Sequence, residues 1–183
     1  VANASVNNKN NGIYPTLSAN GLVRNNISYG SLDTAMWVAA SQNVRVIGNE
    51  LFGSVIGFEI TVSDDVEVKQ NKIYDNTVGV GLFHPNAAGN APLPVMTNWI
   101  IEQNDIYDNN RPNEAPDGTF QGLLPPGAGV LLLGVSGHVI AKNKVEGNDF
   151  VGIGVLDWCS AVNGTPAACA PDGSNLRALP NAD

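Results

Sequence analysis

Hydrophobic residues in this chain alternate with polar ones over short segments, and the segments recur about every 22 residues. Gly, Asn, Asp and Ser separate the segments, as turns require. No stretch keeps a 3.6-residue apolar period long enough to predict a helix. The pattern therefore predicts short β-strands that return to the same faces once in every repeat.

Two phrases define the repeat. In the first phrase, an asparagine stands three positions after one aliphatic residue and two positions before another. These asparagines are Asn25, Asn49, Asn71, Asn104 and Asn143. In the second phrase, a small residue precedes alternating apolar residues, as in Gly57-Phe58-Glu59-Ile60. At a strand spacing of ~4.7 Å, an asparagine at a constant place can hydrogen-bond the amides above and below it. These five residues are therefore predicted to form a ladder in a stacked solenoid.

The phrases resemble those of right-handed parallel β-helix repeat proteins, the pectate-lyase-like class with its carbohydrate-binding and sugar-hydrolase domains. The segments GIYPTLSANGLVRNNI, AASQNVRVIGNEL, GFEITVSDDVEVKQNKIYDN and GAGVLLLGVSGHVIAKNKVEGN are similar to a bacterial secreted subfamily. The resemblance, over roughly residues 10 to 158, implies an all-β, single-stranded right-handed parallel β-helix of about six coils with two loop insertions. It leaves the activity open, because the class hosts lyases, hydrolases, epimerases and adhesins.

We expect a β-helix over residues 1–158 and an irregular C-terminal tail over residues 159–183. The tail holds both cysteines, Cys159 and Cys169, whose close spacing predicts a disulfide clasp in an oxidising compartment, with reduced thiols as the alternative. The insertions fall at about residues 84–95 and 110–126, as tolerated surface loops or as loops around a binding face. A chain that starts at Val1 without a signal peptide is expected to be a piece of a longer parent, whose other domains are candidate partners.

Charge narrows the classes of ligand. The formal net charge is −8 and the pI is about 4.5, which argues against nucleic acid and against anionic membrane surfaces. A polyanionic polysaccharide would also be repelled unless Ca²⁺ bridged the charges. The apolar runs are too short for membrane insertion. We expect a secreted, periplasmic or cell-surface protein whose partner is a polysaccharide or an oligosaccharide.

The outward positions of the second phrase contain the candidate binding surface. If the apolar residues of this phrase, such as Met36 and Phe58, point inward, the residues that alternate with them in each repeat lie in rows on the outer surface. These outward residues include Tyr14, Trp37, Glu59, Thr61 and Phe83. Aromatic rings beside a carboxylate and a hydroxyl suit a sugar ring, which has an apolar face and polar edges. The alternative is that a loop or another domain covers the surface, because Leu131, Leu133 and Leu156 continue the same rows.

Residues suited to catalysis are few: the candidates are Glu59, Asp64, Asp65 and His84. Asp64 and Asp65 could supply oxygen ligands to Ca²⁺, although a polar turn is the simpler account. We expect no resident cofactor, with Ca²⁺ as the one candidate ion. The sequence favours a module for recognition or scaffolding directed at carbohydrate. The alternatives are a polysaccharide lyase or glycoside hydrolase, and a purely structural module of a larger surface protein.

Overall fold

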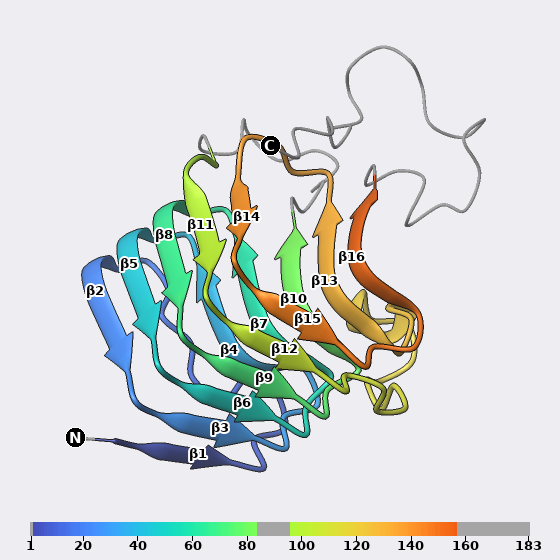
Figure 1. Cartoon of the computed structure of the whole chain (residues 1–183). Helices are drawn as coiled ribbons and strands as arrows, with labels where there is room; N and C mark the ends of the chain where they lie inside the picture. Colours follow the sequence, from blue (N-terminus) through green and yellow to red (C-terminus); the bar gives the residue numbers. More distant parts are fainter. Residues whose placement is uncertain (1, 84–95, 157–183) are drawn as a thin grey trace.

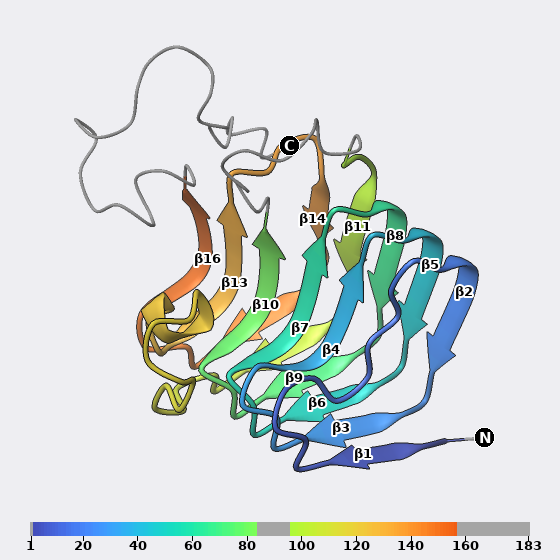
Figure 2. The same cartoon turned by 180° about the vertical axis from the view of Figure 1, so that it is seen from behind.

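A computed structural model describes residues 2–83 and 96–156 of the chain. Apart from one 3-10 turn, η1 (Gln121–Leu123), the regular elements of this part are all β-strands. They wind around one core as three parallel sheets (Figures 1 and 2). None of the described residues forms a helix with the length and apolar character needed to cross a membrane.

Each sheet pairs a strand with its counterpart one repeat later. Sheet A contains, in spatial order, β1 (Ala4–Val6), β3 (Ile27–Tyr29), β6 (Glu50–Phe52), β9 (Lys72–Tyr74), β12 (Asp105–Tyr107) and β15 (Lys144–Glu146). Sheet B contains β16 (Val151–Leu156), β13 (Ala128–Leu133), β10 (Val78–Phe83), β7 (Ile56–Thr61) and β4 (Thr34–Ala39). Sheet C contains β14 (Val139–Ala141), β11 (Trp99–Glu102), β8 (Asp64–Lys69), β5 (Gln42–Ile47) and β2 (Ala19–Arg24). One strand from each sheet makes one coil, so the predicted all-β parallel β-helix is confirmed.

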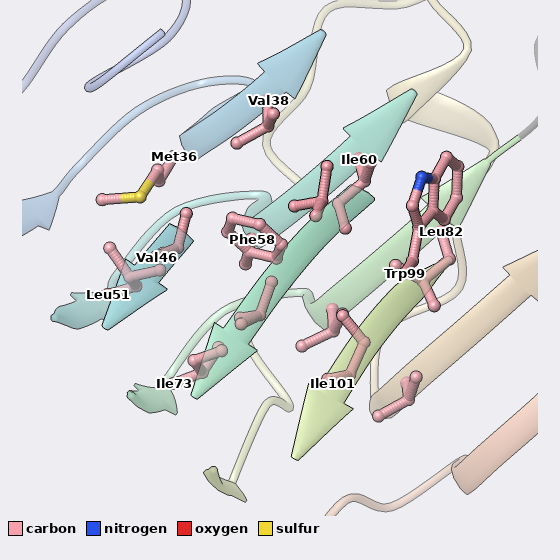
Figure 3. Close-up of a cluster of buried hydrophobic side chains, with 14 of the residues drawn as sticks. Met36, Val38, Val46, Leu51, Phe58, Ile60, Ile73, Leu82, Trp99 and Ile101 are labelled. Atoms are coloured by element: carbon pink, nitrogen blue, oxygen red, sulfur yellow. The ribbon is translucent and has the colours of Figure 1, made fainter. Parts of the chain in front are cut away.

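Apolar side chains from all three sheets fill the interior of the solenoid. Phe58, Leu51 and Trp99 are fully buried there and pack with aliphatic residues of the neighbouring coils (Figure 3). Burial of each large side chain contributes ~1.5–3 kcal/mol, which makes this interior the main source of stability. Trp99 also donates its indole N–H to the carbonyl of Ser63 at 2.8 Å, so the polar edge of its ring is satisfied.

The asparagine ladder is present, and four of its predicted rungs are correct: Asn49, Asn71, Asn104 and Asn143. The Nδ2 of Asn71 donates to Oδ1 of Asn104 at 2.9 Å, and its own Oδ1 accepts from Nδ2 of Asn49 at 3.0 Å. Repeated along the axis, these bonds satisfy buried amides that water cannot reach.

The prediction for Asn25 was wrong by one residue, because the rung in this coil is Asn26. Nδ2 of Asn26 donates to Oδ1 of Asn49 at 3.0 Å. Asn25 instead takes a left-handed backbone conformation with φ 56°, as Gly48 does in the next coil with φ 67°. Leu22 and Ile27 match the aliphatic positions of the phrase, but they do not point inward: they are 49% and 39% exposed. A shift of one residue moves every side chain of a strand to the opposite face.

A second ladder follows the first at a constant offset of five residues. It consists of Ser31, Ser54, Asn76, Asn109 and Asn148. The Nδ2 of Asn76 donates to Oδ1 of Asn109 at 2.9 Å, and Oδ1 of Asn109 lies in the interior as the first ladder does. Sequence reasoning missed this ladder, although a polar residue five positions after each asparagine was the signal.

The insertion at about residues 110–126 lies against the outer face of sheet B. Phe120 meets Phe83 edge to face, with ring centroids 5.2 Å apart, and Leu124 is buried in the same contact. Asn113 holds the loop together by donating to the carbonyls of Gln121 and Leu124 at 2.8 and 2.9 Å. The loop therefore adds a second, smaller apolar cluster outside the coil.

Three predictions fall outside the described residues. These are the candidate catalytic residue His84 with the insertion at about residues 84–95, the Cys159–Cys169 clasp, and the tail over residues 159–183. They stay predictions.

Candidate functional site

The outer face of sheet B brings together most of the predicted binding residues. In the register of the sheet, Trp37 lies opposite Glu59, and Ala39 lies opposite Thr61. Phe83 lies opposite Thr61 on the other side. Ile13 forms a parallel bridge with Met36, so the residues that follow them, Tyr14 and Trp37, also lie side by side. The two predicted outer rows therefore exist as neighbouring residues.

Tyr14 and Trp37 form a fixed aromatic pair. Their rings stack with centroids 4.6 Å apart and planes 16° apart. The indole N–H of Trp37 donates to Oγ1 of Thr61 at 3.0 Å, which sets the orientation of the ring. Trp37 is half-buried, whereas Tyr14 is 44% exposed. The pair therefore presents an aromatic surface to solvent, with Trp37 held in β4 and Tyr14 in the segment that pairs with it through isolated bridges.

The other three predicted residues lie in the next strands of sheet B and are buried. Glu59 is only 3% exposed, and Thr61 and Phe83 are buried as well. Phe83 is covered by Phe120 of the loop, as the alternative interpretation expected for part of this face. Of the five predicted contact residues, Tyr14 and Trp37 are the two that reach solvent.

Glu59 belongs to a buried chain of polar groups that sequence reasoning missed. Oγ1 of Thr34 lies 2.7 Å from Oε2 of Glu59 and 3.1 Å from Oδ1 of Asp33. A hydroxyl carries one hydrogen, so it can donate to one of these carboxyl groups and must accept from the other. One of the two acids therefore carries a proton when both contacts are made.

The environment identifies Glu59 as the protonated acid. Burial raises the pKa of Glu59 to about 8, and the charge of Asp33 acts in the same direction, against the opposing effect of the Thr34 hydrogen bond. Burial also raises the pKa of Asp33, but hydrogen bonds from Thr34 and from the side chain of Gln121 favour its charged form. A neutral Glu59 donates to Thr34, which donates to an ionised Asp33.

The same chain of bonds connects sheet B to the loop, because Gln121 belongs to η1. A signal for Thr34 existed in the sequence. Thr34 stands at the register position that Ile56, Val78 and Ala128 occupy in later coils. A polar residue at an otherwise apolar position of a repeat marks a local departure from the common structure.

Asp64 and Asp65 are the first two residues of β8 in sheet C, whereas Glu59 lies in β7 of sheet B. Asp64 accepts from the backbone N–H of Thr97 at 3.2 Å and from its hydroxyl, and Asp65 accepts from Nδ2 of Asn98 at 2.7 Å. Both carboxylates thus bond to the next coil, from the start of a strand and not from the polar turn that the sequence suggested. Within residues 2–83 and 96–156, no three His, Cys, Asp or Glu side chains gather where they could hold a metal ion.

Comparison with known proteins agrees with this architecture. A family model described as a right handed beta helix region matches residues 1–165 of the chain. No curated protein and no solved structure matches it. Together with the three parallel sheets, a match over most of the chain shows that the protein belongs to the right-handed β-helix family.

Proposed function

We propose that the chain is a secreted or cell-surface recognition module that binds a neutral glycan through Tyr14 and Trp37. The observation that carries this proposal is the stacked pair on sheet B, which combines an exposed ring with a hydrogen-bonded, oriented indole. Rigid aromatic side chains contribute large contact area at low entropic cost and dominate many binding sites. The resemblance to the pectate-lyase-like class supports carbohydrate as the ligand, and the net charge of −8 favours a neutral one.

In this proposal the free face of Tyr14 is the platform for a sugar ring. Trp37 supports the other face of Tyr14 and adds its own exposed edge. Glu59 does not contact the ligand, because it is buried and hydrogen-bonded to Thr34. Its role is to anchor the strand and the loop behind the platform.

A glycan array with and without Ca²⁺ identifies the ligand, and three variants test the site. Tyr14→Ala and Trp37→Ala should each weaken binding by about tenfold or more, the loss expected when a stacking contact and its buried area disappear. Phe150→Ala removes another exposed aromatic ring, on the loop before β16, and should bind as the unaltered protein does. Equal binding by Tyr14→Ala and Phe150→Ala would place the glycan elsewhere.

Glycoside hydrolysis is the second candidate, and one observation favours it: Thr34 links Asp33 to Glu59, whose pKa burial raises to about 8. Hydrolases of this kind use one neutral and one charged carboxyl group. The burial of both groups argues against it, because a scissile bond would have to reach side chains that are 3% and 9% exposed. Release of reducing ends from an array-positive glycan, lost in Glu59→Gln, would establish hydrolysis, and an unsaturated ultraviolet-absorbing product would establish a lyase instead.

A further inference from the structure

Sheet A carries a stack of four aromatic rings on its outer face. The rings belong to Tyr29, Phe52, Tyr74 and Tyr107, one from each of four successive strands. Neighbouring centroids are 4.6 to 5.1 Å apart, and the planes differ by 6° to 11°. Each inner ring is therefore covered on both faces, and a ligand can stack on the column at its ends alone.

Within residues 2–83 and 96–156, no further ring continues the C-terminal end of this stack. The register partner of Tyr107 in the next strand is Glu146, which has no ring to continue the column. The carboxylate of Glu146 turns to the ammonium group of Lys144, at 2.5 Å, within its own strand. A hollow of about 150 Å³ results, lined by Asp105, Tyr107, Lys144 and Glu146.

The groups around the hollow match the surface of a single sugar ring. The face of Tyr107 suits the C–H face of a pyranose, while two carboxylates accept from its hydroxyls and the ammonium group donates to them. Asp105 and Glu146 outweigh Lys144 by one negative charge, so the hollow repels an acidic sugar. We propose that this end of the stack is a second binding site, specific for one neutral pyranose unit of a glycan.

This site is independent of Tyr14 and Trp37, because its residues come from β12 and β15 of sheet A rather than from sheet B. The two sites can therefore be tested in one experiment. The chain has 4 tyrosines, and two of them, Tyr14 and Tyr107, report on the two proposed sites. Tyr29 and Tyr74, inside or at the other end of the stack, serve as internal references.

The experiment is an NMR titration of the whole chain with isotope-labelled tyrosine rings, assigned by single Tyr→Phe variants. The probes are the methyl glycosides of glucose, galactose and mannose, with glucuronate and choline as charged counterparts. At least one neutral glycoside should shift the Tyr107 signal saturably, with smaller shifts from both charged probes. A shift of the Tyr14 signal alone would support the sheet B site and overturn this one.

Two variants separate binding from folding. Tyr107→Ala should weaken the affinity for the glycoside by about tenfold or more, measured from the NMR signals of the ligand because the variant lacks the Tyr107 ring. Glu146→Phe places a fifth ring opposite Tyr107 and should abolish binding while it lengthens the stack and preserves the fold. Tyr74→Phe keeps the stack and should leave the affinity unchanged. If no neutral glycoside shifts Tyr107, if choline shifts it more strongly, or if Glu146→Phe binds normally, the proposal is wrong.

Discussion

At the scale of single residues, this protein depends on buried polar side chains that hydrogen-bond from one coil to the next. The ladder asparagines make their bonds to the coils on either side, so each of them satisfies groups in two neighbouring repeats. Glu59 is accommodated differently: burial raises its pKa and favours the neutral, protonated acid, which hydrogen-bonds to Thr34. An unpaired buried polar group costs ~1–3 kcal/mol, so the loss of either kind of bond should be measurable.

Asn71→Ala tests the ladder at its centre. The substitution leaves the backbone N–H of Asn49 without its acceptor, and it removes one donor each from Oδ1 of Asn104 and the carbonyl of Val46. It should lower the free energy of unfolding by about 2–4 kcal/mol. The matched control is Asn10→Ala, an exposed position outside the ladder, which should change it by less than about 0.5 kcal/mol. Chemical denaturation followed by circular dichroism measures both. Equal midpoints would contradict the structural role of Asn71.

Glu59→Gln tests the protonated acid. The folded pKa of about 8 lies above the ordinary value of 4.5, so the native protein keeps a proton that the unfolded chain loses as pH rises. The contribution of Glu59 is therefore fully present below pH 4.5 and is lost between pH 4.5 and 8. The loss amounts to about 1 kcal/mol per pH unit.

Glutamine keeps a neutral donor at this position, so the variant should lack that loss. The difference in unfolding free energy between variant and original protein should grow in favour of the variant from about pH 5 to about pH 8. Urea denaturation of both proteins at several pH values measures this difference. Other titrating groups, such as His138, are common to both proteins, so their contributions cancel. A constant difference across the range would show that Glu59 is ionised in the folded protein.

At the scale of elements, the glycines of sheet B explain why the second phrase begins with a small residue. A Cβ atom built at Gly79 would lie 2.5 Å from the carbonyl oxygen of Gly129 and 2.8 Å from Nδ2 of Asn109. A Cβ atom at Gly57 or Gly129 would meet the next coil and the second ladder in the same way. The small residue is thus required by the neighbouring coil and not by its own strand.

Gly79→Ala should therefore destabilise the fold by about 1–3 kcal/mol, the usual cost of overpacking, or more if the backbone cannot shift. Gly152→Ala is the matched control on β16, where the nearest described atom to a new Cβ is 3.8 Å away. That variant should change the free energy of unfolding by less than about 0.5 kcal/mol. Thermal and urea unfolding of the pair measure the difference, and similar losses for both would refute the close approach at Gly79.

At the scale of the whole molecule, the solenoid separates its stabilising groups from its accessible ones. The interior holds the apolar residues and both ladders, and each coil contacts the coil before and after it. The outer faces then differ in what covers them. The loop packs over part of sheet B, whereas sheet A leaves its aromatic stack half-exposed along the described coils. Binding surfaces can thus vary from face to face without a change in the core.

The alternation of apolar residues and the recurring asparagines determined the parallel coil and four rungs of the ladder, because inward and outward positions are a local property of a strand. Tertiary structure decided the rest. Both Asn25 and Asn26 follow an aliphatic residue at the right distance, and pairing with the next coil selects Asn26. Asp33 and Glu59 meet through Thr34 across two strands, and a distant loop covers Phe83. These contacts join residues far apart in the sequence, so the register of neighbouring coils and the path of the loop determine which outward side chains reach solvent.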